Sequence, residues 1–414
     1  MMSGEARAPG VLSYAGYRRL FFAQASSTTA SSMFQFVVPL LAYDLTGSAG
    51  TAGLITAVSL GCSSILGLPA GTLADRLDRS RLVVRALVLQ GLVFGALVPL
   101  VSPSTGTALA LAVGAACAAA VGSVLMPAYA GILRAVVPAS RVRDAYTVNQ
   151  GRVYVVSVVA PALAGLLFAI DHRWVLVVAS AFVLLAALVM STAPRNVPQP
   201  GRGQRFWSDM RDGLGYVRRT VRVWTAALGG AVLNLGINGA MYTAVIFLRA
   251  DGTTSTRIAL IEIISSVGAM LGVLLAGLVL RRLSVVAVST ACGAGFAAAS
   301  AISGVWVGPI QIGVLFGLAA ILLPAWNSGV FGGVAADTPH ALQGRVQASI
   351  QLIAALLAPL APLVGGLLLD HVTYPAAMGV FSVLVCCGTT VQVLGLRWRP
   401  RPRRVDTVAG GVGL

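Results

Sequence analysis

The chain of 414 residues contains no lysine: all 29 of its basic residues are arginine, and only 13 residues are acidic. Charged residues make up 10% of the sequence and hydrophobic residues 57%, whereas soluble domains carry roughly 25% charged residues. A soluble protein of this length could not cover so apolar a core with so few charges. The shortage of charge therefore indicates a polytopic membrane protein.

Residues that carry catalysis or bind metals are also scarce. The five cysteines all lie inside apolar runs, where they act as small hydrophobic side chains, so neither a disulfide framework nor a metal site is expected. The three histidines, His172, His340 and His371, lie in or beside loops, and no nucleophile with a base and an orienting group can be assembled. No glycine-rich phosphate-binding loop ending in lysine is present. We expect neither enzymatic activity nor a cofactor.

Long apolar runs are what the sequence has in abundance. Many of them hold about 18 or more residues, enough to cross the roughly 30 Å hydrocarbon layer as a helix. We predict an all-α polytopic membrane protein with twelve transmembrane helices in two pseudo-symmetric bundles. The expected spans are 20–42, 51–74, 81–101, 107–132, 145–169, 174–193, 223–248, 257–280, 284–304, 307–333, 347–369 and 374–396.

The arginines are concentrated in alternate loops of this map. Only Arg173, Arg249 and Arg257 fall on the other side of this map, and Arg152 falls within the fifth span. Because positively charged loops stay in the cytoplasm, both termini are expected there. The net charge of +16 is then explained by topology and by anionic lipids of the bilayer. No nucleic-acid partner is expected, since the arginines are split among separate loops.

The sequence changes character between the two groups of six spans. Prolines and glycines are followed by apolar residues at three-to-four-residue spacing, which predicts an amphipathic helix at the membrane surface. It would either lie on the membrane or cap the bundle, or else act as a regulatory docking site. The apolar residues are Phe206, Met210, Leu214, Val217 and Val221. The domains expected are an N-terminal six-helix bundle at 1–193, a cytoplasmic linker at 194–222, a C-terminal six-helix bundle at 223–397 and a cytoplasmic tail at 398–414.

An internal repeat supports the two bundles. Residues 137–150 align with 338–351, and at the same offset 160–167 aligns with 361–368. We infer that the halves are copies of one unit, related by an axis along the membrane normal. Such halves are typical of transporters that bind substrate at the interface between them.

The loop after the second span places an acidic residue and several arginines on a tight turn. It runs from Gly71 through Asp75 and Arg76 to Arg79 and resembles the signature between helices two and three of the major facilitator superfamily. The resemblance implies that this loop latches the two halves together on the inner side when the protein opens outward, with Gly71 allowing close helix approach. The usual glycine between the arginines is Asp78 here. The alternative is a loop that only sets topology.

Proline and glycine recur in the fifth and eleventh spans, as Pro161 with Gly165 and as Pro362 with Gly366. Proline removes a backbone hydrogen bond and glycine lets helices pack closely. A similar pattern in the fifth helix is associated with efflux in antiporter branches of the superfamily, which favours export. Ala160 replaces its leading glycine, so the match is partial, and a simple kink or packing seam is the other reading.

Only Glu262 and Arg152 place a charge clearly inside a span, where ionisable groups are costly and usually face a cavity or a partner. A carboxyl group shielded from water can load and release a proton near neutral pH, so Glu262 is the proton-coupling candidate. A snorkelling glutamate with a structural role is the alternative. Arg152 could anchor an anionic group of the substrate, organise the gate, or hydrogen-bond neighbouring carbonyls.

Polar residues recur on single faces of several spans, at a spacing that places each set on one side of its helix. They could line a substrate cavity or hydrogen-bond neighbouring helices. The cavity candidates are Gln24, Thr28 and Gln35 in the first span, Asn234 and Asn238 in the seventh, Trp326 and Asn327 in the tenth, and Gln351 in the eleventh. Asp44 and Asp370, at the ends of spans, are expected to serve turns and caps.

Residues 43–48, the Gly71 loop and residues 339–346 together resemble the branch containing macrolide efflux proteins and the enterobactin exporter. The resemblance covers about residues 15–398. It implies proton-coupled efflux of amphipathic drugs, natural products or siderophores by rocking of the two bundles. The all-arginine and alanine-rich usage indicates a bacterial origin, so we expect a monomer in a bacterial inner membrane. A proton-coupled importer of a small solute and a non-transporting membrane receptor with the same fold are the alternatives.

Overall fold

The computed structural model describes residues 10–100, 105–194, 196 and 206–398, and almost all of them are helical. The predicted tail beyond Trp398 and most of the linker before Phe206 lie outside these residues. The N-terminal half contains α1 (Ala15–Thr46), α2 (Ala49–Arg76), α3 (Arg79–Leu97), α4 (Thr105–Gly122), α5 (Leu125–Val136), α6 (Val142–Ile170) and α7 (His172–Ser191). After the linker helix α8 (Phe206–Arg219), the C-terminal half contains α9 (Val221–Ala250), α10 (Ser255–Arg282), α11 (Val285–Ser303), α12 (Pro309–Ala320), α13 (Leu323–Asp337), α14 (Gln343–Leu357), α15 (Leu360–His371) and α16 (Tyr374–Arg397).

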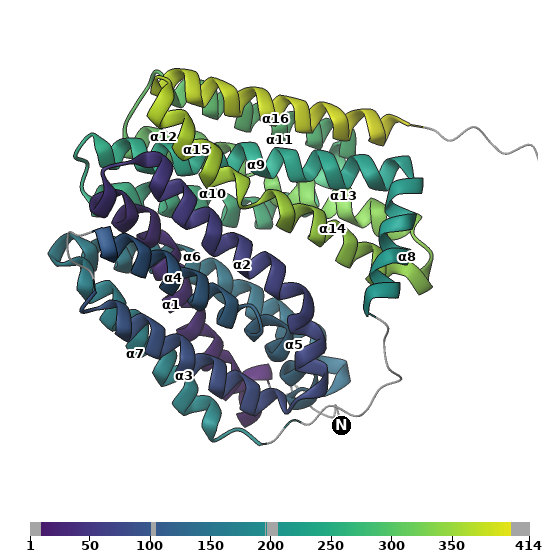
Figure 1. Cartoon of the computed structure of the whole chain (residues 1–414). Coiled ribbons are helices and arrows are strands. Elements are labelled where there is room, and N and C mark those ends of the chain that lie inside the picture. Colours follow the sequence, from purple (N-terminus) through teal and green to yellow (C-terminus); the bar gives the residue numbers. More distant parts are fainter. Residues whose placement is uncertain (1–9, 101–104, 195, 197–205, 399–414) are drawn as a thin grey trace, which may run out of the picture.

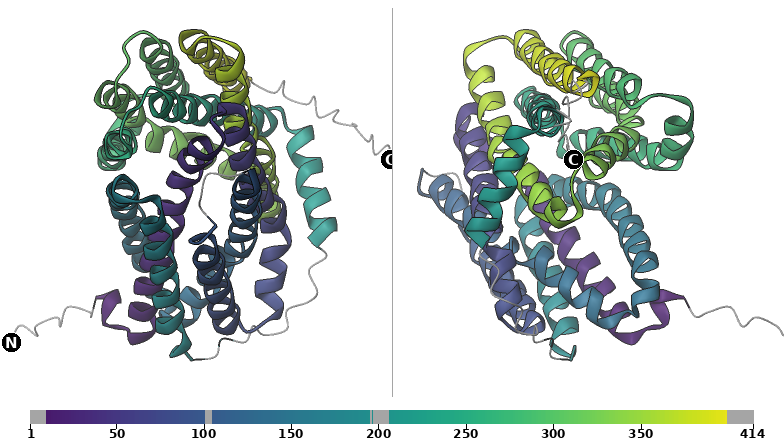
Figure 2. Two further views of the ribbon diagram at one scale, coloured as in Figure 1. Left: turned by 60° about the vertical axis from the view of Figure 1, so that its left-hand side comes forward. Right: turned by 90° about the vertical axis from the view of Figure 1, so that its right-hand side faces the viewer.

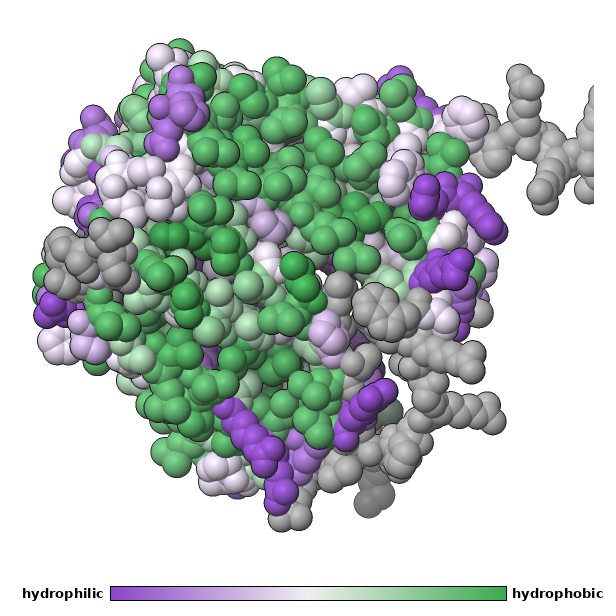
Figure 3. Space-filling view, in the orientation of Figure 1, coloured by the Kyte–Doolittle hydropathy of each residue, from purple (hydrophilic) through white to green (hydrophobic). Residues whose placement is uncertain are grey.

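The helices are long and apolar enough to cross a membrane. In the part of the chain described, eleven helical segments meet both requirements, with α4–α5, α12–α13 and α14–α15 each counted as one. The 32-residue α1 is also long enough to cross, and its polar stripe explains its lower hydropathy. With α1 the count is twelve, as the sequence predicted. Figure 3 shows hydrophobic side chains over the broad middle of one face, with hydrophilic ones gathered toward the edges.

Three spans expected to be continuous are broken, and proline explains each break. A proline cannot hydrogen-bond the carbonyl four residues earlier, and its ring crowds that carbonyl. Pro127, Pro324 and Pro362 each follow a break by a few residues: α4 ends at Gly122, α12 at Ala320 and α14 at Leu357. The predicted single helices 107–132, 307–333 and 347–369 are therefore pairs of shorter helices.

The two halves lie side by side as separate layers (Figures 1 and 2). They meet along two related seams, where α2 packs on α15 and α6 packs on α10. We call the end of the molecule that holds the turns at Gly47 and Gly252 the sealed end. The opposite end, which holds the loop between α2 and α3 and the linker helix α8, is the linker end.

The linker helix α8 docks on the C-terminal half. Met210 and Val217 are buried, and a Cβ on Gly213 would meet the carbonyl of Arg345. The Arg345 guanidinium also lies 3.1 Å from the carboxylate of Asp212. The side of α8 that carries Met210, Gly213 and Val217 therefore packs against α14.

Candidate functional site

A cavity of about 310 Å³ lies between the two halves. Gln35 of α1 reaches it from the N-terminal half, and Asn234 and Asn238 reach it from α9, because residues four apart share one face of a helix. Most of the remaining wall is apolar. Its other lining residues are Phe36, Pro39, Thr56, Leu60, Ala231, Leu235, Met241, Tyr242, Val245, Glu262, Ala354, Ala358, Ala361 and Pro362. We call this space the central cavity; a neighbouring lobe shares Gln35, Phe36, Asn238, Met241 and Glu262.

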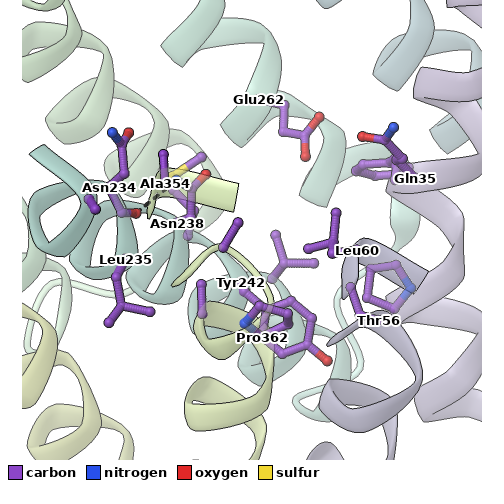
Figure 4. A pocket seen from close by; sticks show the side chains of 17 residues that line it. Gln35, Thr56, Leu60, Asn234, Leu235, Asn238, Tyr242, Glu262, Ala354 and Pro362 are labelled. Carbon is purple, nitrogen blue, oxygen red and sulfur yellow. Dashed lines mark hydrogen bonds between the residues drawn. The ribbon is translucent and has the colours of Figure 1, made fainter. Parts of the chain in front are cut away.

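Glu262 is the acidic residue of this wall. It projects from α10 on the side of the cavity facing Gln35, while Tyr242 and Thr56 lie together elsewhere on the wall (Figure 4). Glu262 lies seven residues after the start of α10 at Ser255, about 10 Å from the sealed end at 1.5 Å per residue. Within the described residues it has no ion-pair partner and no side-chain hydrogen bond. The arrangement leaves its carboxyl group free for a ligand or a proton.

The sealed end is closed by Asp44 and Asp370, the two acids for which the sequence predicted turn and cap roles. Asp44 of α1 pairs with Arg249 of α9. Asp370 of α15 accepts hydrogen bonds from the Ser48 hydroxyl at 3.1 Å and from the backbone N–H groups of Ala49 at 3.1 Å and Gly50 at 2.9 Å.

Both acids therefore bind across the two halves, a contact that the predicted turn and cap roles did not include. Asp370 does cap a helix, but the helix is α2 of the other half. The signal in the sequence was the scarcity of arginine in the loops on this side, which leaves Arg249 as one of few partners for Asp44.

Gly165 and Gly366 lie at equivalent points of the two seams. The Gly165 carbonyl accepts hydrogen bonds from the hydroxyls of Ser255 at 2.9 Å and Thr256 at 3.3 Å. A Cβ on Gly366 would meet the backbone of Ala49. Both glycines thus allow one half to approach the other at the sealed end.

Pro161 lies within α6, which remains continuous. The carbonyl it cannot bond, that of Ser157 four residues earlier, accepts a hydrogen bond from the Ser266 hydroxyl of α10 at 3.3 Å. A neighbouring helix therefore satisfies the freed backbone group. In the eleventh span Pro362 instead follows the break between α14 and α15 and lines the central cavity.

At the linker end the Gly71 loop contacts its own half. Asp75 pairs with Arg79 at 3.0 Å, while Asp78 accepts hydrogen bonds from the backbone N–H groups that begin α3. Arg76 is exposed. A Cβ on Gly71 would meet no atom within 4 Å, so the close helix approach expected there is absent from this conformation.

Several cavity candidates lie elsewhere. Trp326 is 1% exposed and donates a 2.6 Å hydrogen bond to Gln392, so it belongs to the core of the C-terminal half. Asn327 and Gln351 are exposed and line neither the central cavity nor its lobe. The burial of Trp326 contradicts its predicted place in the cavity wall. For Asn327 and Gln351, which line neither space in this conformation, a cavity role stays a prediction.

Gln24 and Arg152 are buried together inside the N-terminal half. The Arg152 guanidinium donates hydrogen bonds to the Gln24 carbonyl at 3.0 Å, the Thr28 hydroxyl at 2.9 Å and Asn149 Oδ1 at 2.9 Å. Neither Arg152 nor Gln24 lines the central cavity. Carbonyl and amide contacts, one of the predicted alternatives, describe this arginine.

Comparisons with known proteins point to one family. The model of the Major Facilitator Superfamily matches residues 20–358. Among solved structures, the fold is similar to that of a mutant of the nucleoside transporter NupG, with a TM-score of 0.76 at 11% identity over 92% of this chain and 100% of that one.

Two further structures are of bacterial proteins. One is a homologue of the iron transporter ferroportin in an inward-facing state, with a TM-score of 0.73 at 15% identity over 94% of this chain and 100% of that one. The other is a homologue of the human lysosomal transporter Spinster, inward-facing and unoccupied, with a TM-score of 0.69 at 15% identity over 94% of this chain and 99% of that one. No curated protein matches the chain.

Proposed function

Because the chain belongs to the major facilitator superfamily, a family of transporters, we propose that it is a proton-coupled exporter of amphipathic compounds. The substrates would be drugs, natural products or siderophores, and the protein would act in a bacterial inner membrane. The single observation that carries this proposal is Glu262, an acidic side chain in the mostly apolar wall of the central cavity that has no partner among the described residues.

The chemistry of the wall favours an amphipathic substrate. Phe36, Leu60 and Met241 offer apolar surface, whereas Gln35 and Asn238 offer amide groups. Binding sites of this kind hold a ligand through apolar contact and orient it through a few polar groups. The cavity lies between the two repeats, where rocking of the halves can expose it to either side of the membrane in turn.

Glu262 supports coupling to protons. An unpaired carboxylate at membrane depth is costly, so either a proton or a polar group of the substrate stabilises it. If the two compete, a proton entering from one side releases the substrate, and loss of the proton on the other side allows the next substrate to bind. This exchange is antiport.

The inner side is assigned to the linker end. The arginine-rich loops lie there, and such loops stay in the cytoplasm. The contacts between Asp44 and Arg249 and around Asp370 then hold the outer side shut. In this conformation the central cavity would load from the cytoplasm, as an exporter requires. The partial match around Pro161 to the efflux pattern also favours export.

The test uses purified protein in liposomes with an imposed pH gradient and a panel of hydrophobic drugs and siderophores. We expect substrate to move against the proton flux, and Glu262→Gln to abolish the effect of the gradient. Asp251→Asn, at an exposed turn of the sealed end, is the matched control and should behave like the wild type.

Movement of substrate in the same direction as protons would identify the importer instead. Gradient-driven transport by Glu262→Gln at the wild-type rate would remove Glu262 from the mechanism. Absence of transport across the panel, with normal folding, would favour the receptor alternative.

A further inference from the structure

A second cavity, of about 380 Å³, lies within the N-terminal half among α1 to α5. It shares Gln35 and Leu60 with the central cavity, so the two spaces adjoin. We call it the N-terminal pocket. Its polar lining includes Ser27, Thr28, Ser31, Gln35, Ser59, Ser63, Gln90, Ser123 and Tyr129, and its apolar lining includes Phe34, Phe94 and Met126. Among the described residues, no charged side chain belongs to the lining.

The hydroxyl of Thr28 is a prepared hydrogen-bond donor. It accepts a 2.9 Å hydrogen bond from the guanidinium of Arg152, which is 6% exposed. That positive charge polarises the hydroxyl, and hydrogen bonds assisted by a charge are stronger than neutral ones. Among the described residues the Thr28 hydroxyl donates to no protein acceptor. Its proton is therefore available to an oxygen atom in the pocket.

Gln90 adds a buried amide with unused capacity. Its side chain is 3% exposed, and its Nε2 donates to the carbonyl of Ala118 at 3.3 Å. Its Oε1, however, has no hydrogen-bond partner. A buried polar atom without a partner is costly and calls for an explanation. A ligand hydroxyl that donates to this oxygen would supply one.

Further hydroxyls surround these two groups. Tyr129 and Ser27 share a hydrogen bond at 3.1 Å, while the hydroxyls of Ser31 and Ser63 have no protein partner in the described part of the chain. The pocket thus offers both donors and acceptors. Because none of the described lining residues carries a carboxylate, these residues would not attract a cation.

The pocket also differs from a site built for an anion. Arg152 places a fixed charge against the lining residue Thr28, but Thr28, Asn149 and the Gln24 carbonyl occupy its Nη1 and Nε groups. Its field therefore reaches a ligand through the Thr28 hydroxyl. Such an arrangement favours oxygen atoms with partial negative charge.

We propose that the N-terminal pocket binds an uncharged, oxygen-rich part of the substrate, with several hydroxyl, ether or amide groups, while the apolar part lies in the central cavity. This proposal rests on the proposed function and deepens it. It assigns the substrate class: a neutral hydroxylated head joined to an apolar body.

The test compares two fluorescent probes with the same apolar body. One carries an uncharged sugar head, and the other carries an alkyl group of similar size. Binding is measured with the protein in lipid nanodiscs, and transport is measured in liposomes. The variants are Thr28→Val, which keeps the side-chain shape, and Gln90→Leu. Ser26→Ala is the matched control, since Ser26 lies on α1 and bonds the Phe182 carbonyl without lining the pocket.

We expect each of the two variants to weaken binding of the sugar probe about 5- to 10-fold, as loss of one hydrogen bond predicts, and to leave the alkyl probe within about twofold. Equal effects on both probes, or no effect on either, would overturn the pocket assignment. A third probe with an anionic head that binds more tightly than the sugar probe would also overturn it.

The design separates this proposal from the proposed function. If Glu262→Gln abolishes gradient-driven transport of both probes while Thr28→Val and Gln90→Leu leave head selectivity unchanged, only the pocket assignment fails. If the wild type transports neither probe under a gradient, yet binds the sugar probe through Thr28, the pocket stands and the transport proposal fails. Thermal unfolding of each variant shows whether a loss reflects misfolding.

Discussion

The carboxylate of Asp44 accepts two hydrogen bonds from the guanidinium of Arg249, at 2.7 and 2.6 Å, and so joins the end of α1 to the end of α9. The same guanidinium lies over the ring of Phe168 of α6, 5.3 Å from its centre. One ion pair therefore ties three helices from both halves together at the sealed end. Any opening of this end must break it.

Loss of the Asp44–Arg249 pair should favour opening of the sealed end. An ion pair of this exposure contributes about 1 kcal/mol, so Asp44→Asn is expected to shift the balance of conformations roughly fivefold. Spin-label distances across the sealed end would measure the shift. Exchanging the two residues, with Asp44→Arg and Arg249→Asp together, should restore much of the closure. A distance distribution unchanged in Asp44→Asn would contradict the role.

Asp370 should act as a cap for α2 across the interface. Asp370→Ala removes the acceptors for the N–H groups of Ala49 and Gly50, while the Ser48 hydroxyl still accepts from the N–H of Thr51. Loss of such a cap costs about 1 kcal/mol. Asp370→Asn keeps one acceptor oxygen and should have a smaller effect. Hydrogen exchange of the amides of Ala49 and Gly50 would report it directly. Equal protection in Asp370→Ala and the wild type would mean that the cap contributes nothing.

Gly366→Val should prevent the sealed end from closing. The new Cβ would meet the backbone of Ala49, which cannot move aside as a flexible side chain can. We expect an outward-open protein with little transport, detected by spin-label distances and flux assays. Gly379→Ala on α16, where a Cβ meets nothing within 4 Å, is the control. Normal closure in Gly366→Val would show that the seam can repack.

Asp75→Asn should abolish transport without lowering stability. In the present conformation Asp75 is exposed, and Arg79 is its ion-pair partner among the described residues. Such a pair between residues four apart on an exposed surface contributes about a few tenths of a kcal/mol. The latch predicts that Asp75 meets its partners in the other half only when the protein opens outward. Asp144→Asn, which removes a similarly exposed pair with Arg141, is the control. Wild-type flux in Asp75→Asn would exclude the latch.

Trp326→Phe should lower stability and spare substrate binding. It removes the buried 2.6 Å hydrogen bond to Gln392, whose Nε2 already lacks a partner. The expected loss is about 1–3 kcal/mol of the free energy of unfolding, measured by thermal or denaturant unfolding in detergent. A change in substrate affinity with unchanged stability would instead show that Trp326 contacts the substrate.

Local composition was enough to determine the number of spans, the membrane class and the fold. Apolar length and arginine placement depend only on how each segment meets lipid and water, so they can be read without knowing which helices are neighbours. The helical period also predicted which residues of α1 and α9 share a face. Gln35, Asn234 and Asn238 accordingly reach the central cavity.

Only the tertiary structure decided which face of each helix meets the interface. Trp326 and Gln351 were predicted to line the cavity, as Asn238 was. In the structure Trp326 is buried in a core and Gln351 is exposed on the surface. It also paired Asp44 with Arg249 and brought Asp370 to α2, across 205 and more than 300 residues of sequence. Such contacts depend on how two bundles dock, and a one-dimensional pattern does not contain that information.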